Sequence, residues 1–222
     1  MSGPVNPVRR YDTTRRREQA MENRARVLSA AGQLFLDKGY AETSMPEIAQ
    51  VAGVSVQTVY KAFANKATLL KAVFDVSVAG DDDRTPMAER EVIGAIRAEP
   101  DATLKIVRYT RHLAEGAHRI APVQLLARDA AGADSAAARV WAQMRQEMLT
   151  AMTYFAADLI DTGQVHAGLA PDEVRDVLWT YHSPELYELL VLERGWTAER
   201  YGRFLGEAMI NALIEPAGMI EA

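Results

Sequence analysis

One short stretch, residues 43–63, constrains the fold more than any other part of the sequence. It reads TSMPEIAQVAGVSVQTVYKAF and contains two short helical patterns separated by a glycine, Gly53. Ser44 and Glu47 have the spacing of a capping box before the first pattern, and Ser55 can cap the second. Gly53 tolerates the left-handed backbone conformation that a tight turn requires. The stretch therefore predicts two short helices held at a wide angle.

These two helices should share a small core and leave one face of the second helix exposed. Inward positions are expected at Ile48, Ala49, Val51, Ala52, Val54, Val59, Tyr60 and Phe63. The exposed face then consists of Ser55, Val56, Gln57, Thr58 and Lys61. Such a helix fits the major groove of DNA, where hydroxyl, amide and ammonium groups bond base edges or phosphates. Tyr60 and Lys66 are placed to hold flanking phosphates. The alternative is an ordinary helical hairpin with a polar surface.

Helical periodicity continues through the rest of the chain, and no stretch alternates with period two. Apolar spacing and capping residues predict helices at 14–38, 65–78, about 100–120, from 141 to near 163, 171–194 and 197–214. Pro184 should kink the helix at 171–194. The run Asp81–Asp83 marks a domain boundary. We therefore expect an all-α chain with a flexible arm at 1–13, a helix-turn-helix domain at 14–64, a connecting helix at 65–80 and a larger helical domain at 81–222.

Charge is distributed unevenly along the chain. Residues 1–75 hold 11 Lys and Arg against 7 Asp and Glu, a net charge of +4, whereas the remainder holds 14 against 23, a net charge of −9. A basic first third on an acidic body suggests that only the first third meets a polyanion. Five arginines lie in or beside the predicted arm: Arg9, Arg10, Arg15, Arg16 and Arg17. The arm could follow the minor groove of DNA or remain a solvated tail.

The sequence from Arg24 to Phe74 closely resembles the DNA-binding domain of the TetR family of regulators. The similar elements are LFLDKGY, the T-S-x-x-E-I-A segment, the A-G-V-S turn, T-V-Y-x-x-F and N-K-x-x-L-L, in fixed order and spacing. The resemblance implies DNA contacts from Ser55, Val56, Gln57, Thr58, Tyr60 and Lys61, and backbone phosphate contacts from Thr43 and Lys66. Val56-Gln57 departs from the Lys-Gly pair that many members carry, which leaves the base preference open.

The same resemblance implies a helical C-terminal domain that dimerises and binds a small-molecule inducer. The helices at 171–194 and 197–214 are apolar on more than one side, which favours pairing with their copies in a homodimer. Gly202 and Gly206 could permit a close helix approach there. An apolar cavity with a few polar anchors is the usual form of a ligand site. Candidate lining residues are Tyr109, His112, Trp141, Met144, Arg145, Trp179 and His182.

Other functions are less well supported by the sequence. Glu115 and His118 have an E-x-x-H spacing, but di-iron bundles need a second copy and further glutamates. Phosphate-binding loops and nucleophile elbows are absent, so we expect no enzyme, catalytic residue, metal or cofactor. The chain has no cysteine and no long apolar run, which fits a cytoplasmic protein without membrane contact. A repressor released by an inducer is the main prediction; an activator or a ligand-independent regulator on the same fold is the alternative.

Overall fold

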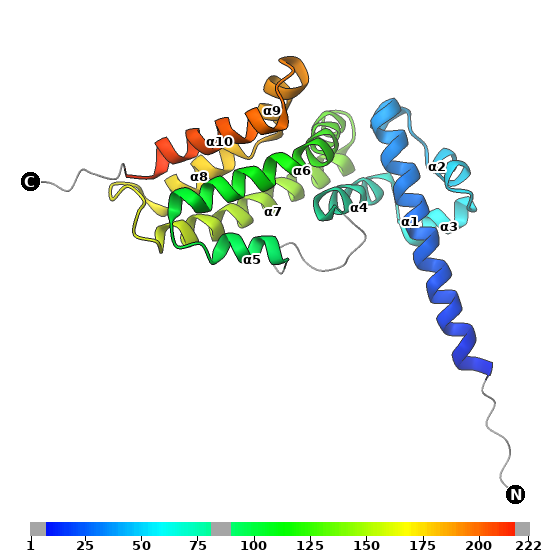
Figure 1. Cartoon of the computed structure of the whole chain (residues 1–222). Coiled ribbons are helices and arrows are strands. Elements are labelled where there is room, and N and C mark those ends of the chain that lie inside the picture. Colours follow the sequence, from blue (N-terminus) through cyan, green and yellow to red (C-terminus); the bar gives the residue numbers. More distant parts are fainter. Residues whose placement is uncertain (1–7, 81–89, 216–222) are drawn as a thin grey trace, which may run out of the picture. The chain divides into compact units, whose positions relative to one another are not determined.

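The computed structural model describes residues 8–80 and 90–215, with side chains from Thr14 onward (Figure 1). Its regular elements in these ranges are helices, so the all-α prediction is confirmed. In order they are α1 (Val8–Glu42), α2 (Met45–Ala52), α3 (Val56–Ala62), α4 (Lys66–Ala79), α5 (Glu91–Arg97), α6 (Ala102–Ala131), α7 (Ser135–Ile160), α8 (Pro171–Tyr181), α9 (Pro184–Tyr187), the π-helical segment η2 (Glu188–Glu193) and α10 (Ala198–Leu213).

The chain forms two compact units, Met1–Val73 and Phe74–Ala222, which we call the N-terminal unit and the body. The division falls within α4. The predicted boundary at residues 81–83 lies outside the described residues. The connecting helix predicted at 65–80 corresponds to α4, with Asn65 accepting a hydrogen bond from the backbone N–H of Thr68 at 2.9 Å.

In the N-terminal unit, α1 and α2 make extensive contact and α3 packs on both. Ser44 caps α2 by accepting a hydrogen bond from the N–H of Glu47, and Gly53 ends it with a φ of 65°. The predicted capping box is only half formed, because the Glu47 carboxylate pairs with Lys38 of α1 instead. The core is built from apolar side chains of all four helices, among them Phe35, Ile48, Val59, Phe63 and Leu69.

Three expectations for this unit need correction. α1 begins at Val8, so the backbone at Arg9 and Arg10 is helical, where an arm was predicted; residues 1–7 of that arm lie outside the described residues. No glycine or proline occurs between Val8 and Gly32, so the sequence does not interrupt the helix. Val51 and Tyr60 were expected to face inward, yet they are 53% and 50% exposed.

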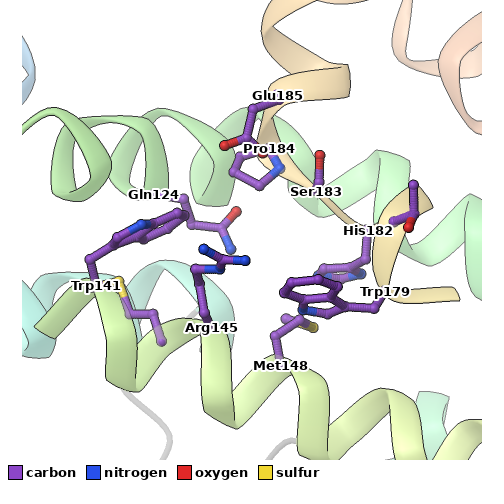
Figure 2. A pocket seen from close by; sticks show the side chains of 11 residues that line it. Gln124, Trp141, Arg145, Met148, Trp179, His182, Ser183, Pro184 and Glu185 are labelled. Carbon is purple, nitrogen blue, oxygen red and sulfur yellow. The ribbon is translucent and has the colours of Figure 1, made fainter. Parts of the chain in front are cut away.

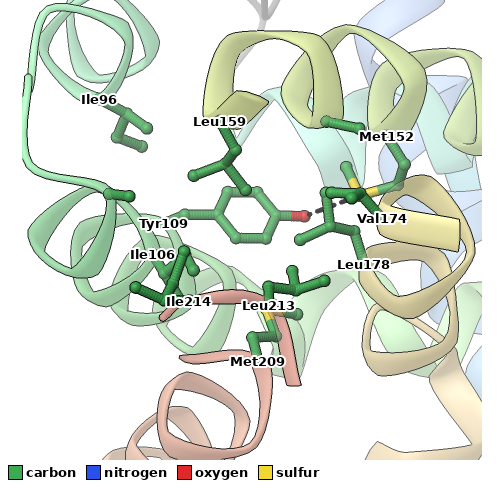
Figure 3. Close-up of a cluster of buried hydrophobic side chains, with 12 residues drawn as sticks. Ile96, Ile106, Tyr109, Met152, Leu159, Val174, Leu178, Met209, Leu213 and Ile214 are labelled. Carbon is green, nitrogen blue, oxygen red and sulfur yellow. Dashed lines mark hydrogen bonds between the residues drawn. The ribbon is translucent and has the colours of Figure 1, made fainter. Parts of the chain in front are cut away.

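The body is organised around α6, which packs against α7 and α10, while α8 packs on α7 and α10 (Figure 1). Its main core holds large apolar side chains from several helices around the Tyr109 ring (Figure 3). Ile106, Leu159, Leu178, Met209 and Leu213 are fully buried there. A second cluster joins α6, α9 and α10 through alanines of α6, Tyr187, Tyr201 and Leu205.

The helix bounds in the body differ from the prediction at two prolines. α6 continues through Pro122 to Ala131, because buried residues such as Val123 and Leu125 follow the proline and packing offsets its cost. At Pro184 the expected kink is instead a break: α8 ends at Tyr181, and Ser183 has an extended backbone with φ −69° and ψ 137°. A residue before proline disfavours the helical conformation, which explains this break. α5 was not predicted.

The close approach expected at Gly202 and Gly206 occurs within the chain. A Cβ atom at Gly202 would lie 2.8 Å from the Cβ of Ala114 and 3.2 Å from the carbonyl oxygen of Thr110. At Gly206 it would lie 3.0 Å from the Thr110 hydroxyl oxygen. The two glycines therefore let α10 lie directly on α6.

Candidate DNA-binding face and ligand cavity

α3 presents the exposed face that the sequence predicts. Ser55 caps the helix by accepting a hydrogen bond from the N–H of Thr58 at 3.1 Å, and the two hydroxyl oxygens lie 2.8 Å apart. Val59 and the Phe63 cap are buried and anchor the helix to the core. The outward positions bring together Ser55, Val56, Gln57, Tyr60 and Lys61, all exposed, with Thr58 half-buried beside them. The arrangement offers an amide, an ammonium group and a phenol to a partner.

Thr43 and Lys66 have roles inside the unit that the sequence analysis missed. The chain bends at Gly39, which has a φ of 83°. Nearby carbonyl groups then need donors. The Thr43 side chain is 1% exposed, and its hydroxyl lies 2.8 Å from the carbonyl oxygen of Gly39. The Lys66 ammonium donates to the carbonyl groups of Tyr40 and Thr43 at 2.8 and 3.0 Å. Neither side chain is arranged for the expected phosphate contact.

The body contains a cavity of about 370 Å³ between α6, α7, α8 and the start of α9 (Figure 2). Five of the seven predicted ligand residues line it: Trp141, Met144, Arg145, Trp179 and His182. The prediction missed Gln124, Met148, Thr180, Ser183, Pro184 and Glu185, which also line it. Its size is within the range of small-molecule sites.

The two remaining candidates do not line this cavity. Tyr109 lies behind it, with its hydroxyl oxygen 2.7 Å from Nδ1 of His182 and 3.5 Å from the Met152 sulfur. Burial lowers the pKa of His182 to about 4 and raises the pKa of Tyr109. His182 is therefore neutral at pH 7. His112 is half-buried elsewhere on α6, and burial lowers its pKa too.

Arg145 is the cationic group of the cavity. Its guanidinium carbon lies 4.9 Å from the ring centroid of Trp179 and 5.9 Å from that of Trp141. Figure 2 shows the guanidinium and the Gln124 amide reaching into the space between the two indole rings. Both distances are within the range of cation–π attraction.

Arg128 of α6 binds α9 and η2, the segment whose first residues line the cavity. Its guanidinium donates to both carboxylate oxygens of Glu188, at 2.7 and 3.1 Å, and lies 3.7 Å from a carboxylate oxygen of Glu185. The hydrogen bond from Arg128 lowers the pKa of Glu188. This two-pronged geometry fixes the position of the segment that carries Pro184 and Glu185.

The E-x-x-H pair offers little for metal binding. Glu115 and His118 are both exposed on α6. Within residues 8–80 and 90–215, no group of three or more histidines and carboxylates is placed to hold a metal ion.

None of the helices in the described part of the chain is both long and apolar enough to cross a membrane.

The similarity to known proteins is strongest in the N-terminal unit. Residues 27–73 match the model of the bacterial regulatory proteins of the tetR family. The chain is 41% identical to the transcriptional regulator TtgR of Pseudomonas putida over 61 residues. This alignment covers 28% of this chain and only 29% of that protein. It is 27% identical over 154 residues to the regulator UidR of Escherichia coli, covering 69% of this chain and 72% of that protein.

The fold extends this similarity beyond the N-terminal unit. The crystal structure of the regulator FadR from Bacillus subtilis in complex with stearoyl-CoA aligns with a TM-score of 0.68 and 20% identity, covering 85% of this chain and 98% of that one. The similar proteins are transcriptional regulators, not enzymes. Residues 27–73 thus match the DNA-binding domain of the tetR family, and the described helices share the fold of solved transcriptional regulators.

Proposed function

We propose that this chain is a sequence-specific DNA-binding repressor that acts as a homodimer and is released from its operator by a small molecule. The exposed face of α3 carries the DNA-binding part of the proposal, because Gln57, Tyr60 and Lys61 project from a helix whose opposite side is anchored in the core. Gln57 is suited to read a base edge, and Lys61 to hold a phosphate.

The cavity in the body supports control by a ligand. A solid core would have favoured a ligand-independent regulator, whereas a cavity lined by aromatic, methionine and polar side chains can hold a small molecule. The similar FadR structure contains a bound stearoyl-CoA. A ligand shifts the protein between two states only by its difference in affinity for them. The two recognition helices of a dimer must lie roughly 34–36 Å apart to meet successive major grooves, so the released state is one that disfavours this spacing.

α4 is the proposed link between the two sites, because its residues contribute to both units. Its end is held to the body by a hydrogen bond of 2.6 Å from the Arg90 guanidinium to the carbonyl oxygen of Ala79. The homodimer is proposed through the last helices, including η2, where Leu189 and Leu192 are 50% and 55% exposed. Much of the apolar surface of α10 is already buried within the chain, so these leucines carry more of the proposal than α10 does.

The test begins with selection of DNA sequences from a random library by the purified full chain. We expect a palindromic site with half-sites about one helical turn apart or a multiple of it. Gln57→Ala should then change the preference at one base position by about 1–3 kcal/mol, whereas Lys61→Ala should weaken binding to all sequences alike. Gln50→Ala, an exposed glutamine on α2, is the matched control and should leave the preference unchanged. Enrichment of no sequence would contradict the proposal.

The sign of regulation is measured separately by transcription in vitro from a promoter that carries the selected site. Repression predicts that added protein lowers transcript yield. A rise in yield would instead identify an activator, with the same DNA-binding face.

A further inference from the structure

The charges and rings around the body cavity indicate which class of molecule fits it. Resting on the ligand-controlled function proposed above, we propose that the cavity binds a small organic anion: a carboxylate attached to a flat aromatic body. The anion would bind Arg145 and Gln124, and the body would pack against the indole of Trp141 and the methionines Met144 and Met148.

Arg145 has its binding capacity open to such an anion. Within the described part of the chain it forms no ion pair with a carboxylate, and its side chain contacts the two indole rings. A cation–π contact with Trp179 uses none of the guanidinium N–H donors, so they remain available to an anion. That edge matches the two oxygens of a carboxylate.

Gln124 is a second polar group directed into the cavity. Its side chain is 6% exposed and makes no hydrogen bond with the other described residues. An amide so placed can donate to a carboxylate oxygen beside Arg145. Two neighbouring donors therefore converge on one position, and neither is satisfied by the protein around it.

Among the described residues, the cavity lining holds one other charged group besides Arg145. Glu185 contributes a carboxylate, 3.7 Å from the Arg128 guanidinium that is already paired with Glu188, so it keeps a negative charge at the cavity. His182 is hydrogen-bonded to Tyr109 and is neutral at pH 7. Arg145 is thus the one cation among the described residues that line the cavity, and an anion would bind beside it and away from Glu185.

A cationic ligand is the main rival, because tryptophans also form cages for ammonium groups. Here Arg145 already lies over these rings. An incoming cation would have to displace a like charge, whereas an anion gains a partner. Two tryptophan rings without a cation between them would favour a cationic ligand. With Arg145 over them, they favour an anion.

The experiment uses the full chain and three naphthalene probes of similar shape: 2-naphthoate, 2-naphthamide and 2-naphthylmethylammonium. Dissociation constants are measured by titration calorimetry. We expect 2-naphthoate to bind at least about tenfold more tightly than the amide, and the ammonium probe to bind most weakly. Equal binding of the acid and the amide, tighter binding of the ammonium, or no binding of any probe would overturn the proposal.

Two variants assign the preference to the cavity. Arg145→Gln should remove the tenfold preference for the acid while leaving the binding of 2-naphthamide within about twofold. Arg139→Gln, an exposed arginine on the same helix α7 that does not line the cavity, should leave both constants unchanged. An acid preference that persists in Arg145→Gln would place the anion elsewhere and overturn the assignment.

DNA affinity separates this inference from the proposed function. If 2-naphthoate binds through Arg145 and DNA affinity does not change, the anion site stands and control by this ligand fails. If the amide or the ammonium probe binds best and lowers DNA affinity, the regulator is ligand-controlled and the anion inference fails.

Discussion

In the N-terminal unit, the residues proposed to contact DNA lie between Ser55 and Lys61, on one short helix with its own cap. In the body, the cavity takes its lining from residues as far apart as Gln124 and Glu185, on four helices. The first site depends on a cap, a turn and a few anchoring side chains. The second exists only when long helices pack in the correct register. Local contacts fix one site, and distant contacts fix the other, so the two should respond differently to the same kind of perturbation.

The largest expected effect concerns the distant contact between His182 and Tyr109. The pKa of His182 is about 4 in the folded chain and near 6.5 when unfolded, so the unfolded chain takes up a proton first as the pH falls. Stability that is complete above pH 6.5 should decline through the interval down to pH 4, by up to about 3 kcal/mol. Urea unfolding between pH 7.5 and 4 measures this loss.

His182→Asn is the matched variant, because the asparagine side-chain amide can donate to or accept from the Tyr109 hydroxyl in place of Nδ1 without gaining a proton. Carboxylates also titrate in this range, so the informative quantity is the difference in unfolding free energy between the wild type and the variant. As the pH falls, the unfolding free energy of the wild type should decrease more than that of the variant. A difference that is constant between pH 7.5 and 4 would contradict the role of His182.

The contact between α10 and α6 should be the next most sensitive. Gly202→Ala places a Cβ atom 2.8 Å from that of Ala114, so α10 must move away from α6. We expect a net loss of about 2 kcal/mol in unfolding free energy, since overpacking costs about 1–3 kcal/mol. Gly94→Ala in α5 is the control: nothing lies within 4 Å of the added atom, and the substitution should stabilise the chain by up to about 1 kcal/mol. Similar effects at both positions would show that the helix contact is not tight.

The same contrast explains what could be predicted from the sequence. Ser44, Gly53 and Ser55 determine helix ends through bonds to residues at most four positions away, so the pattern of residues 43–63 gave the correct elements. Pro184 was recognised, but whether it would kink or break the helix depends on packing around it. The partners of Gly202 and Lys66 lie far away in the chain, which periodicity cannot reveal. Gln124 follows a proline and was missed because the helix was expected to end before it.

Within the N-terminal unit, the cap of α3 should give a smaller and local effect. Ser55→Ala removes the oxygen that accepts the Thr58 N–H, and a lost cap of this kind costs about 1 kcal/mol. Ser55→Gly should lose only a few tenths of a kcal/mol, because glycine is tolerated at this position. Thermal or urea unfolding of the three chains measures both changes. Equal losses in the two variants would argue against a capping role for the Ser55 hydroxyl.

The smallest effect is expected at Val51, where periodicity and structure disagree. A buried valine cut back to alanine leaves a cavity and costs stability. Val51 is 53% exposed, so Val51→Ala removes little buried surface. Alanine is also the better helix former, and the variant should be neutral or more stable by up to about 0.5 kcal/mol. Val59→Ala, at a position that is 0% exposed in the adjacent helix, should instead lose about 2 kcal/mol or more. The two valines therefore test whether Val51 faces outward from α2. A loss of 1 kcal/mol or more in Val51→Ala would mean that Val51 is buried, as the apolar periodicity of the sequence predicts.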